Sequence, residues 1–423
     1  MAGKSKLARR LSYIKKRETT NTKNAPAQKT SPQPSHQVDT KQLASAISGI
    51  PGWQPVGRYT FRKIEDFQIH KKVPGTGKTP DTLLISPATD WKKIFWDIET
   101  TGLSSSAGNR IILFGFGYYI HPQNSNSAHP NTFRVEQYFL VDYPGEGEFL
   151  QNIYAAFTYP EAVYISYNGK GFDSHMLVER MLMNGIRWNL PFQYDLLHTA
   201  RRLYRKTLPS CSLSSIENEI LNIKRKNDIP GSEIPAEYNR FLETGNIGRL
   251  PDMFSHNTQD ILTLECLYRH AATLLISPKK RTGLEDPVGM AFLLFKTNRT
   301  NSAVIELENG YFRKGNQQAG KYVSAYYKRN GMWNKAEHLW QDMCKKSLSV
   351  FGRVELAKYY EHRLKKCKKA HLLVTEALAI PCLDDAMRES LRYRKKRLER
   401  KLSDKTESAQ YSASNPPING NTL

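Results

Sequence analysis

Hydrophobic and polar positions alternate with two different periods along the middle of the chain. Short apolar runs rich in aromatic and β-branched residues predict strands at 93–99, 111–120, 132–141 and 162–167. Longer segments with helical spacing predict helices at 146–157, 172–184, 196–204, 212–222 and 252–275. Three strands in hairpin order, then a helix and a fourth strand, favour an α/β fold in which helices flank a mixed sheet.

After residue 280 the strand pattern ends and only helical spacing remains. Within it, Tyr326 recurs as Tyr360 and Ala336 as Ala370, a period of 34 residues. This is the length of a tetratricopeptide helix pair, in which a small alanine lets the two helices approach closely. Two copies also fit an ordinary helical bundle, so both all-α arrangements remain open.

The pattern therefore divides the chain into five segments. We expect a disordered basic arm (1–45), an N-terminal extension (46–90), the α/β domain (91–278), a helical, tetratricopeptide-like domain (279–403) and a disordered polar tail (404–423). Disorder is expected in the arm because it is rich in Lys, Thr, Pro, Gln and Ser and poor in apolar residues.

The net charge of +22 is unevenly distributed over these segments. Residues 1–45 contain ten Lys or Arg and two Asp or Glu, a net of +8, and residues 279–423 contain twenty-nine against fifteen, a net of +14. The segment between them has no net charge. Two basic flanks around a neutral centre suit a polyanionic partner such as nucleic acid, although a solubilising surface has the same composition.

Cysteine usage and hydropathy exclude several classes of protein. The five cysteines never form a Cys-x-x-Cys pair, which argues against a disulfide framework and a thiolate zinc site. No apolar run reaches the roughly 18 residues of a membrane span, and the basic start lacks the apolar core of a signal peptide. We therefore expect a cytoplasmic protein without a membrane partner, with a mitochondrial-type presequence as the alternative.

The segment "KKIFWDIETTGL" (92–103) ends a hydrophobic strand on two carboxylates. Asp97 and Glu99 are two residues apart, so their side chains leave the strand on the same face. Two carboxylates that face one point repel each other unless a cation lies between them. A pair of solvated acids at an exposed strand end is the simpler interpretation.

Two further acids occur where helices could present them to the same point. Asp173 follows a strand and the turn "NGKG", and it begins a helix whose dipole favours negative charge. Asp260 lies in the first half of a long helix that has an apolar face. Four carboxylates suit two hard divalent cations, Mg²⁺ or Mn²⁺, and such a pair can cleave a phosphodiester bond.

The motifs "WDIETTGL", "YNGKGFD" and "HNTQD" resemble, in order, the three motifs of the DEDD 3′–5′ exonucleases of the ribonuclease-H-like superfamily. The stretches "YDLLHTARRLYR", "LPSCSLSSIE" and "DIPGSEIPAEY" resemble the YprB-like branch, predicted exonucleases with a tetratricopeptide-like C-terminal region. The resemblance implies a metal-dependent exonuclease of DNA or RNA that uses two ions. The alternatives are a weak or inactive nucleic-acid-binding scaffold, or an adaptor that binds a protein partner through its helical repeats.

The same resemblance implies roles for individual residues. Asp97, Glu99, Asp173 and Asp260 would be the metal ligands, with Asp97 shared by both ions. Thr101 and Leu103 match positions that in the family approach the terminal nucleotide, although turn formation and core packing explain them equally well.

His256 departs from the commoner patterns of the resembling family. One branch has a tyrosine base four residues before the last aspartate, and the other has a histidine five residues before it. This chain has a histidine at the spacing of four. Because four residues are about 400° of helix, His256 and Asp260 should share a face, which makes His256 the candidate general base. The alternative is a structural histidine near the helix start.

Four other features have simpler interpretations. His175 is predicted to point away from Asp173, and Asp195 is predicted to cap a helix. Lys170 is interpreted as an exposed lysine, with contact to a phosphate as the alternative. The basic run 392–401 is either a solvated helix face or part of a binding surface.

Overall fold

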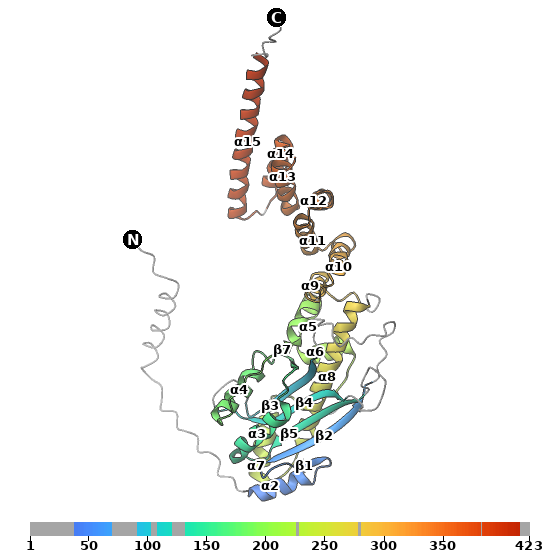
Figure 1. The fold of residues 1–423 in the computed structure, drawn as a ribbon, viewed down its shortest axis with the longest axis vertical. Helices are drawn as coiled ribbons and strands as arrows, with labels where there is room; N and C mark the ends of the chain where they lie inside the picture. Colours follow the sequence, from blue (N-terminus) through green and yellow to red (C-terminus); the bar gives the residue numbers. More distant parts are fainter. Residues whose placement is uncertain are drawn as a thin grey trace, which may run out of the picture.

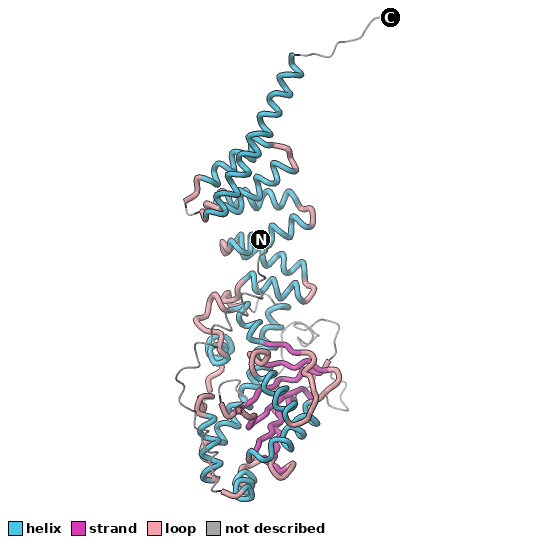
Figure 2. Tube along the Cα trace, turned by 90° about the vertical axis from the view of Figure 1, so that its left-hand side faces the viewer, coloured by secondary structure: helices cyan, strands magenta, loops and turns pink. Residues whose placement is uncertain are grey.

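A seven-stranded mixed sheet lies at one end of an elongated molecule, and a row of helices extends from it (Figure 1). The computed structural model describes residues 38–69, 91–102, 108–120, 132–225, 228–277, 281–381 and 383–414, with side chains to residue 404. Figure 2 shows the same division after a quarter turn, with all strands in one part and only helices in the other.

The sheet has the order β1-β2-β5-β4-β3-β6-β7. Its strands are β1 (Trp53–Pro55), β2 (Thr60–Gln68), β3 (Lys92–Thr100), β4 (Ile111–Ile120), β5 (Thr132–Leu140), β6 (Ala162–Ser166) and β7 (Gln193–Asp195). Neighbours from β1 to β3 pair antiparallel, whereas β3–β6 and β6–β7 pair parallel. The predicted α/β class and the four predicted strands are therefore confirmed.

The structure adds elements that the hydrophobic pattern did not predict. Strand β2 has lysine and acidic side chains at its partly exposed positions, and only backbone pairing with β5 along its whole length makes it a strand. Helix α2 (Thr40–Ser48) begins inside the segment predicted to be a disordered arm. That boundary was wrong because Asp39 caps the helix and Leu43 and Ile47, one turn apart, are fully buried.

Helices cover both faces of the sheet. Helices α3 (Glu146–Phe157) and α4 (Asp173–Met183) pack on the face that receives Trp96 of β3. On the other face lie α5 (Leu196–Tyr204) and α8 (Leu250–Ile276), which pack against Phe95. The short α6 (Leu213–Ile216), the π-turn η3 (Glu217–Leu221) and α7 (Ile234–Thr244) connect them. Because Asp97 and Glu99 share the face of Phe95, they point toward α8.

Two glycines of β4 let helix α8 lie directly on the sheet. Gly115 pairs with Asp97 and Gly117 pairs with Phe95 in the register of β3 and β4. A Cβ atom on Gly115 would lie 2.0 Å from Oδ1 of Asn257 and 2.6 Å from Ile261 Cδ1, both on α8. The missing side chains therefore set the distance between α8 and the acidic end of β3.

The helical part consists of seven helices in the described residues. They are α9 (Pro287–Lys296), α10 (Thr300–Phe312), α11 (Gln317–Arg329), α12 (Trp333–Lys346), α13 (Val350–His362), α14 (Cys367–Leu378) and α15 (Asp385–Ser414). Ala336 of α12 and Ala370 of α14 are fully buried, as expected of small residues between packed helices. The tetratricopeptide assignment itself stays a prediction. None of the described helices is both long and apolar enough to cross a bilayer.

Helix α15 corrects two expectations about the C-terminal end. It continues to Ser414, beyond the boundary at 403 after which the chain was predicted to be disordered. Within the basic run 392–401, Arg394 and Arg397 donate hydrogen bonds to the buried Glu361 of α13. Part of that run is therefore a structural link between two helices rather than a free basic surface.

The close approach of α8 predicts a large effect of a single methyl group. Gly115→Ala should destabilise the protein by about 1–3 kcal/mol, because Asn257 and Ile261 must move away from the sheet. Thermal denaturation measures this. Gly147→Ala is the matched control. Gly147 lies in helix α3, where alanine is favoured, and its Cβ would lie 3.4 Å from Asn184 Oδ1, an ordinary contact distance. Equal stability of the two variants would contradict this account of the α8 contact.

Candidate active site

Strand β3 brings the first two carboxylates beneath helix α8. Asp97 Oδ2 accepts a hydrogen bond of 3.0 Å from Asn257 Nδ2, and Asn257 is itself fully buried. The register between β3 and β4 shifts at Glu99 and Thr100, next to these acids. Such bulges redirect side chains at the end of a strand, here at the point where Glu99 leaves the sheet.

The third carboxylate is the first residue of helix α4. The preceding turn depends on Asn168, whose φ of 64° lies in the left-handed region that asparagine tolerates. Asp195 accepts a hydrogen bond of 2.9 Å from the backbone N–H of Asn168 and one of 3.0 Å from Leu197. The predicted helix cap at Asp195 is thus confirmed, and the same carboxylate also fixes the turn that positions Asp173.

Helix α8 supplies the fourth acid together with the histidine. His256 Nε2 lies 3.6 Å from Asp260 Oδ2 and 3.8 Å from Glu99 Oε1. The expectation that His256 and Asp260 share one helix face is therefore confirmed, and the imidazole also contacts the strand acid. Both side chains are only 14% exposed, so these contacts are shielded from solvent.

Arg225 lies across the same group and was not predicted from the sequence. It follows η3 in an irregular segment, and its guanidinium donates to Asp260 and to the buried Glu217. Glu217 in turn accepts from the hydroxyl of Thr263 on α8. An arginine within the charged run "KRKND" reads as a loop residue, so only the fold shows that it enters the site.

Asp228 is a second unpredicted residue, and it binds the far side of His256. Its Oδ1 lies 2.7 Å from His256 Nδ1, whereas Arg225 Nη1 lies 3.2 Å from that nitrogen. The shorter contact is to an obligate acceptor, so Nδ1 donates to Asp228, and Nε2 is the ring nitrogen that faces Glu99 and Asp260. A signal existed, since Asp228 opens the stretch "DIPGSEIPAEY".

The proximity of four acids shifts their pKa values upward. Burial, then the charges of Asp260, Glu99 and Asp173, raises the pKa of Asp97 well above its ordinary value. Burial, followed by Asp195 and Asp260, raises the pKa of Asp173 to about 7. Burial also raises the pKa of Asp260, against the opposing charges of His256 and Arg225. The site therefore contains more negative charge than its own cations balance.

These residues suit a divalent cation by donor chemistry. Buried carboxylates with excess negative charge are the oxygen ligands that hard ions prefer. Among the described residues, however, no three His, Cys, Asp or Glu side chains lie close enough together to hold one metal ion. Asn257 donates a hydrogen bond to Asp97 and Arg225 donates one to Asp260. The four acids therefore lie near one another without forming a complete set of metal ligands. Their role as metal ligands stays a prediction.

The remaining predicted residues lie as follows. Thr101 forms the turn after β3, where its hydroxyl accepts a hydrogen bond of 2.9 Å from the Arg110 backbone. This contact agrees with its structural interpretation, and contact with substrate stays a prediction. Leu103 lies outside the described residues. His175 and Lys170 are exposed, as their simpler interpretations require.

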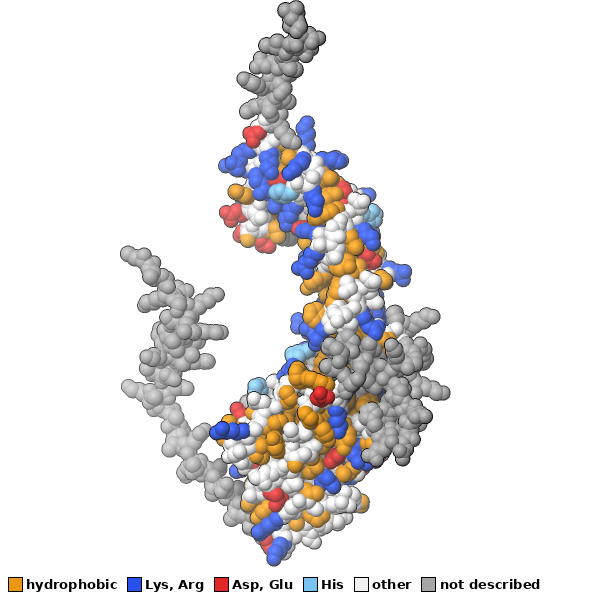
Figure 3. All heavy atoms as spheres, viewed as in Figure 1, with side chains coloured by type: hydrophobic (Ala, Val, Ile, Leu, Met, Phe, Trp, Pro, Cys, Tyr) orange, Lys and Arg blue, Asp and Glu red, His pale blue; other side chains and the backbone are white. Residues whose placement is uncertain are grey.

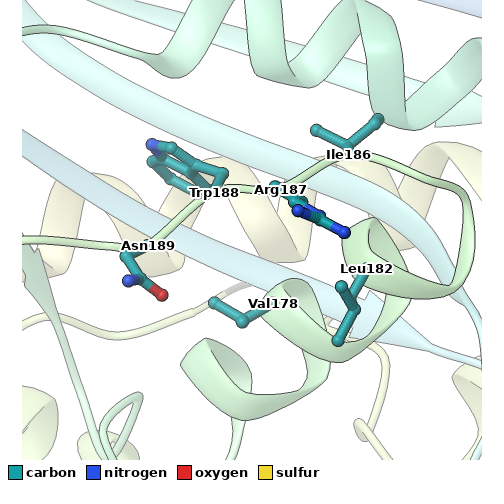
Figure 4. Close-up of a pocket in the computed structure, with 6 residues that line it drawn as sticks. All are labelled: Val178, Leu182, Ile186, Arg187, Trp188 and Asn189. Carbon is teal, nitrogen blue, oxygen red and sulfur yellow. The ribbon is translucent and has the colours of Figure 1, made fainter.

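A separate cavity of about 250 Å³ lies beside the other end of α4. Figure 4 shows its lining, which includes Val178 and Leu182 of α4 and Trp188 of the following loop. Trp188 packs edge-on against Phe157 and Tyr164. None of the candidate site residues lines this cavity, so we assign it to the packing of α4 against the sheet.

Comparison with known proteins identifies the class of this domain. A model of the RNase_H superfamily matches residues 94–272, the segment that contains all four acids. Together with the strand order, this match identifies residues 94–272 as a ribonuclease-H-like domain. Uncharacterized protein YprB of Bacillus subtilis (strain 168) is 30% identical over 324 residues, which cover 73% of this chain and 75% of that protein. The chain belongs to the YprB family.

Solved structures with the same kind of domain are much more distant. E. coli exonuclease I in complex with a dT13 oligonucleotide is 20% identical with a TM-score of 0.25, over 40% of this chain and 43% of that chain. The family B DNA polymerase from Pyrobaculum calidifontis is 11% identical with a TM-score of 0.31, over 65% and 36% of the two chains. This chain thus spans less than half of either structure, and likeness at this level carries no information about activity.

The raised pKa of Asp173 predicts that stability depends on pH. The unfolded carboxyl loses its proton near 3.8 and the folded one near 7, so the folded state binds more protons between these values. Without divalent ions, stability should therefore fall by on the order of a few kcal/mol as the pH rises from about 4 to 8. Asp173→Asn should flatten this profile, and thermal denaturation in chelator measures it. A wild-type midpoint that rises over this range would contradict the assignment.

Proposed function

We propose that this protein is a DEDD-type 3′–5′ exonuclease that hydrolyses phosphodiester bonds of DNA or RNA with divalent cations, Mg²⁺ or Mn²⁺. One observation carries the proposal. Four partly buried carboxylates, from β3, α4 and α8, have pKa values raised by burial and by neighbouring acids, and the imidazole of His256 faces two of them. Structural ion pairs also bring acids together, but they do so with matching cations, whereas among the described residues Arg225 faces four acids and Glu217.

The four acids have one task in this scheme. Asp97, Glu99, Asp173 and Asp260 would hold the cations, and their unbalanced charge would supply the attraction. When bound, two such ions supply an activated water and neutralise the leaving oxygen. The guanidinium of Arg225 donates to Asp260 and Glu217. It would bind a phosphate oxygen of the substrate, because the fork of an arginine matches phosphate geometry.

His256 would take the proton of the attacking water. Its Nε2 faces Glu99 and Asp260, and its Nδ1–H donates to Asp228. With its proton on Nδ1, the imidazole would have the lone pair of Nε2 available to accept a proton, as a general base requires. Asp228 is then a positioning residue, because it acts on the reaction only through the orientation of His256.

Nucleic acid as the partner is supported by the distribution of charge. The helical part carries much of the +14 of the C-terminal segment, and Figure 3 shows Lys and Arg side chains over this part of the molecule. Contacts to phosphates from such side chains give affinity that does not depend on sequence.

The acids should be essential for turnover. Asp97→Asn and Asp260→Asn should abolish the metal-dependent release of nucleotides from an end-labelled oligonucleotide, because each removes a ligand charge. Asp252→Asn on the same helix is the control, since Asp252 is exposed and pairs with Arg249. Turnover by either acid variant at the wild-type rate would refute the assignment. Wild-type protein that binds the oligonucleotide but releases nothing would instead identify a binding scaffold.

The histidine and its partner should act as one unit. His256→Ala should lose about 10²–10⁴ in turnover, the usual contribution of a positioned acid–base group. Asp228→Ala should lose less, and the double variant should be no slower than His256→Ala alone. The exposed His175 provides the matched control, His175→Ala. Losses that multiply in the double variant would show that Asp228 does not act through His256.

A further inference from the structure

Two adjoining cavities lie next to the candidate active site, between the nuclease domain and the first helix of the helical part. One, of about 390 Å³, lies between α5 and α9, and the other, of about 300 Å³, lies at the start of α5. They share His198 and Arg202, so they adjoin each other. Below, the two cavities together are called the α5–α9 cleft.

The lining of the cleft is strongly basic. Its cationic side chains come from α5, α9, the segment after α5 and the turn before α4: Lys170, Arg201, Arg202, Arg205, Lys206 and Lys296. Its two acids balance only part of this charge. Asp195 caps α5, and Asp286 accepts hydrogen bonds from Gly289 and, at 3.1 Å, from Lys206. The uncompensated charge of the cleft is therefore positive.

The cations are close enough to affect one another. Burial, followed by the charges of Arg202 and Lys170, lowers the pKa of Lys296. A cluster of like charges that the fold holds together lacks the anion that would balance it. Since three separate elements contribute these cations, the cluster is a property of the tertiary structure and not of one charged helix.

An aromatic side chain adds a second kind of contact. Phe292 of α9 lines the cleft and is 50% exposed, although the neighbouring Leu293 and Leu294 are buried. The guanidinium of Arg202 lies 4.1 Å from the centre of its ring. Basic side chains beside an exposed aromatic ring are the features with which proteins bind unpaired nucleotides, by phosphate contacts and base stacking.

The cleft reaches the acids through shared residues. Asp195 lines it, fixes the turn before Asp173 and contributes to the raised pKa of Asp173. Lys170, which also lines the cleft, belongs to that same turn and precedes Asp173 by three residues. A strand whose end lies at the four acids would therefore find its next phosphates at the α5–α9 cleft.

We propose that the α5–α9 cleft binds the backbone of a single-stranded nucleic acid upstream of the nucleotide being removed, with one base stacked on Phe292. This inference rests on the proposed exonuclease function and specifies its substrate as single-stranded. A duplex fits less well, because its bases are already stacked on their neighbours and do not offer a face to the ring.

Binding measured without turnover tests the cleft. The probes are fluorescein-labelled single strands of DNA and of RNA, about 15 nucleotides long, and the blunt DNA duplex, titrated with full-length protein in chelator. The double variant Arg202→Glu/Lys296→Glu should bind single strands at least tenfold more weakly, with a salt dependence reduced by about one unit per lost phosphate contact. Phe292→Ala should weaken binding about 5- to 100-fold.

Matched controls separate the cleft from general charge effects. Arg187→Glu reverses an exposed charge that lines the cavity at α4, and Phe312→Ala removes an aromatic side chain that is 41% exposed on α10. Both should bind like the wild type. The milder Arg202→Gln/Lys296→Gln keeps the test valid if charge reversal impairs folding, which circular dichroism shows.

Three results would overturn the inference. They are unchanged binding by the cleft variants, equal binding of the duplex, and equally effective competition by a polyglutamate peptide, which would indicate an acidic protein partner. The two proposals can fail separately. Cleft-dependent binding without any nucleotide release would remove the exonuclease function alone, whereas release without dependence on the cleft would remove only this site.

Discussion

The packing of helix α8 directly on strands β3 and β4 is the contact on which the candidate site depends. Two glycines of β4 leave no side chain between helix and sheet, so Asn257 reaches Asp97 and the imidazole of His256 reaches Glu99. Apolar residues of the same helix, such as Ile261 and Leu264, are buried against the sheet. The hydrophobic face of α8 thus fixes the position of its polar residues.

That contact brings like charges together in a buried place. Burial and mutual repulsion both raise the pKa values of the acids, so the site opposes folding while the surrounding core favours it. Arg225 relieves part of this repulsion through Asp260 and Glu217. A local excess of negative charge is common at functional sites, because binding another molecule and stabilising the fold place opposite demands on the same residues.

The sequence was sufficient for those parts of the fold that local pattern determines. The central strands and the four acids could be predicted because an apolar run ends at Asp97 and Glu99 and because the three motifs that contain the acids occur in order. Strand β2 could not, because its polar residues look like a loop until β5 pairs with them. Arg225 and Asp228 escaped prediction for a related reason: both lie in irregular backbone, and only the tertiary structure brings them to His256. The structural role of Gly115 could not be predicted either, because it depends on contact with a helix about 140 residues later in the chain.

A single hydrophobic core runs from Phe95 in the sheet to Leu398 in the last helix, without a break between the two parts of the molecule. At their junction α9 approaches so closely that a Cβ on Gly289 would lie 1.9 Å from the carbonyl oxygen of Arg202 on α5. The helical part is therefore not an appendage on a linker. Recombination that exchanged it for another module near residue 278 would leave the ribonuclease-H-like domain with an exposed apolar face. A substitution in the core of one part therefore has to be compensated by a substitution in the other, so the two parts should evolve together.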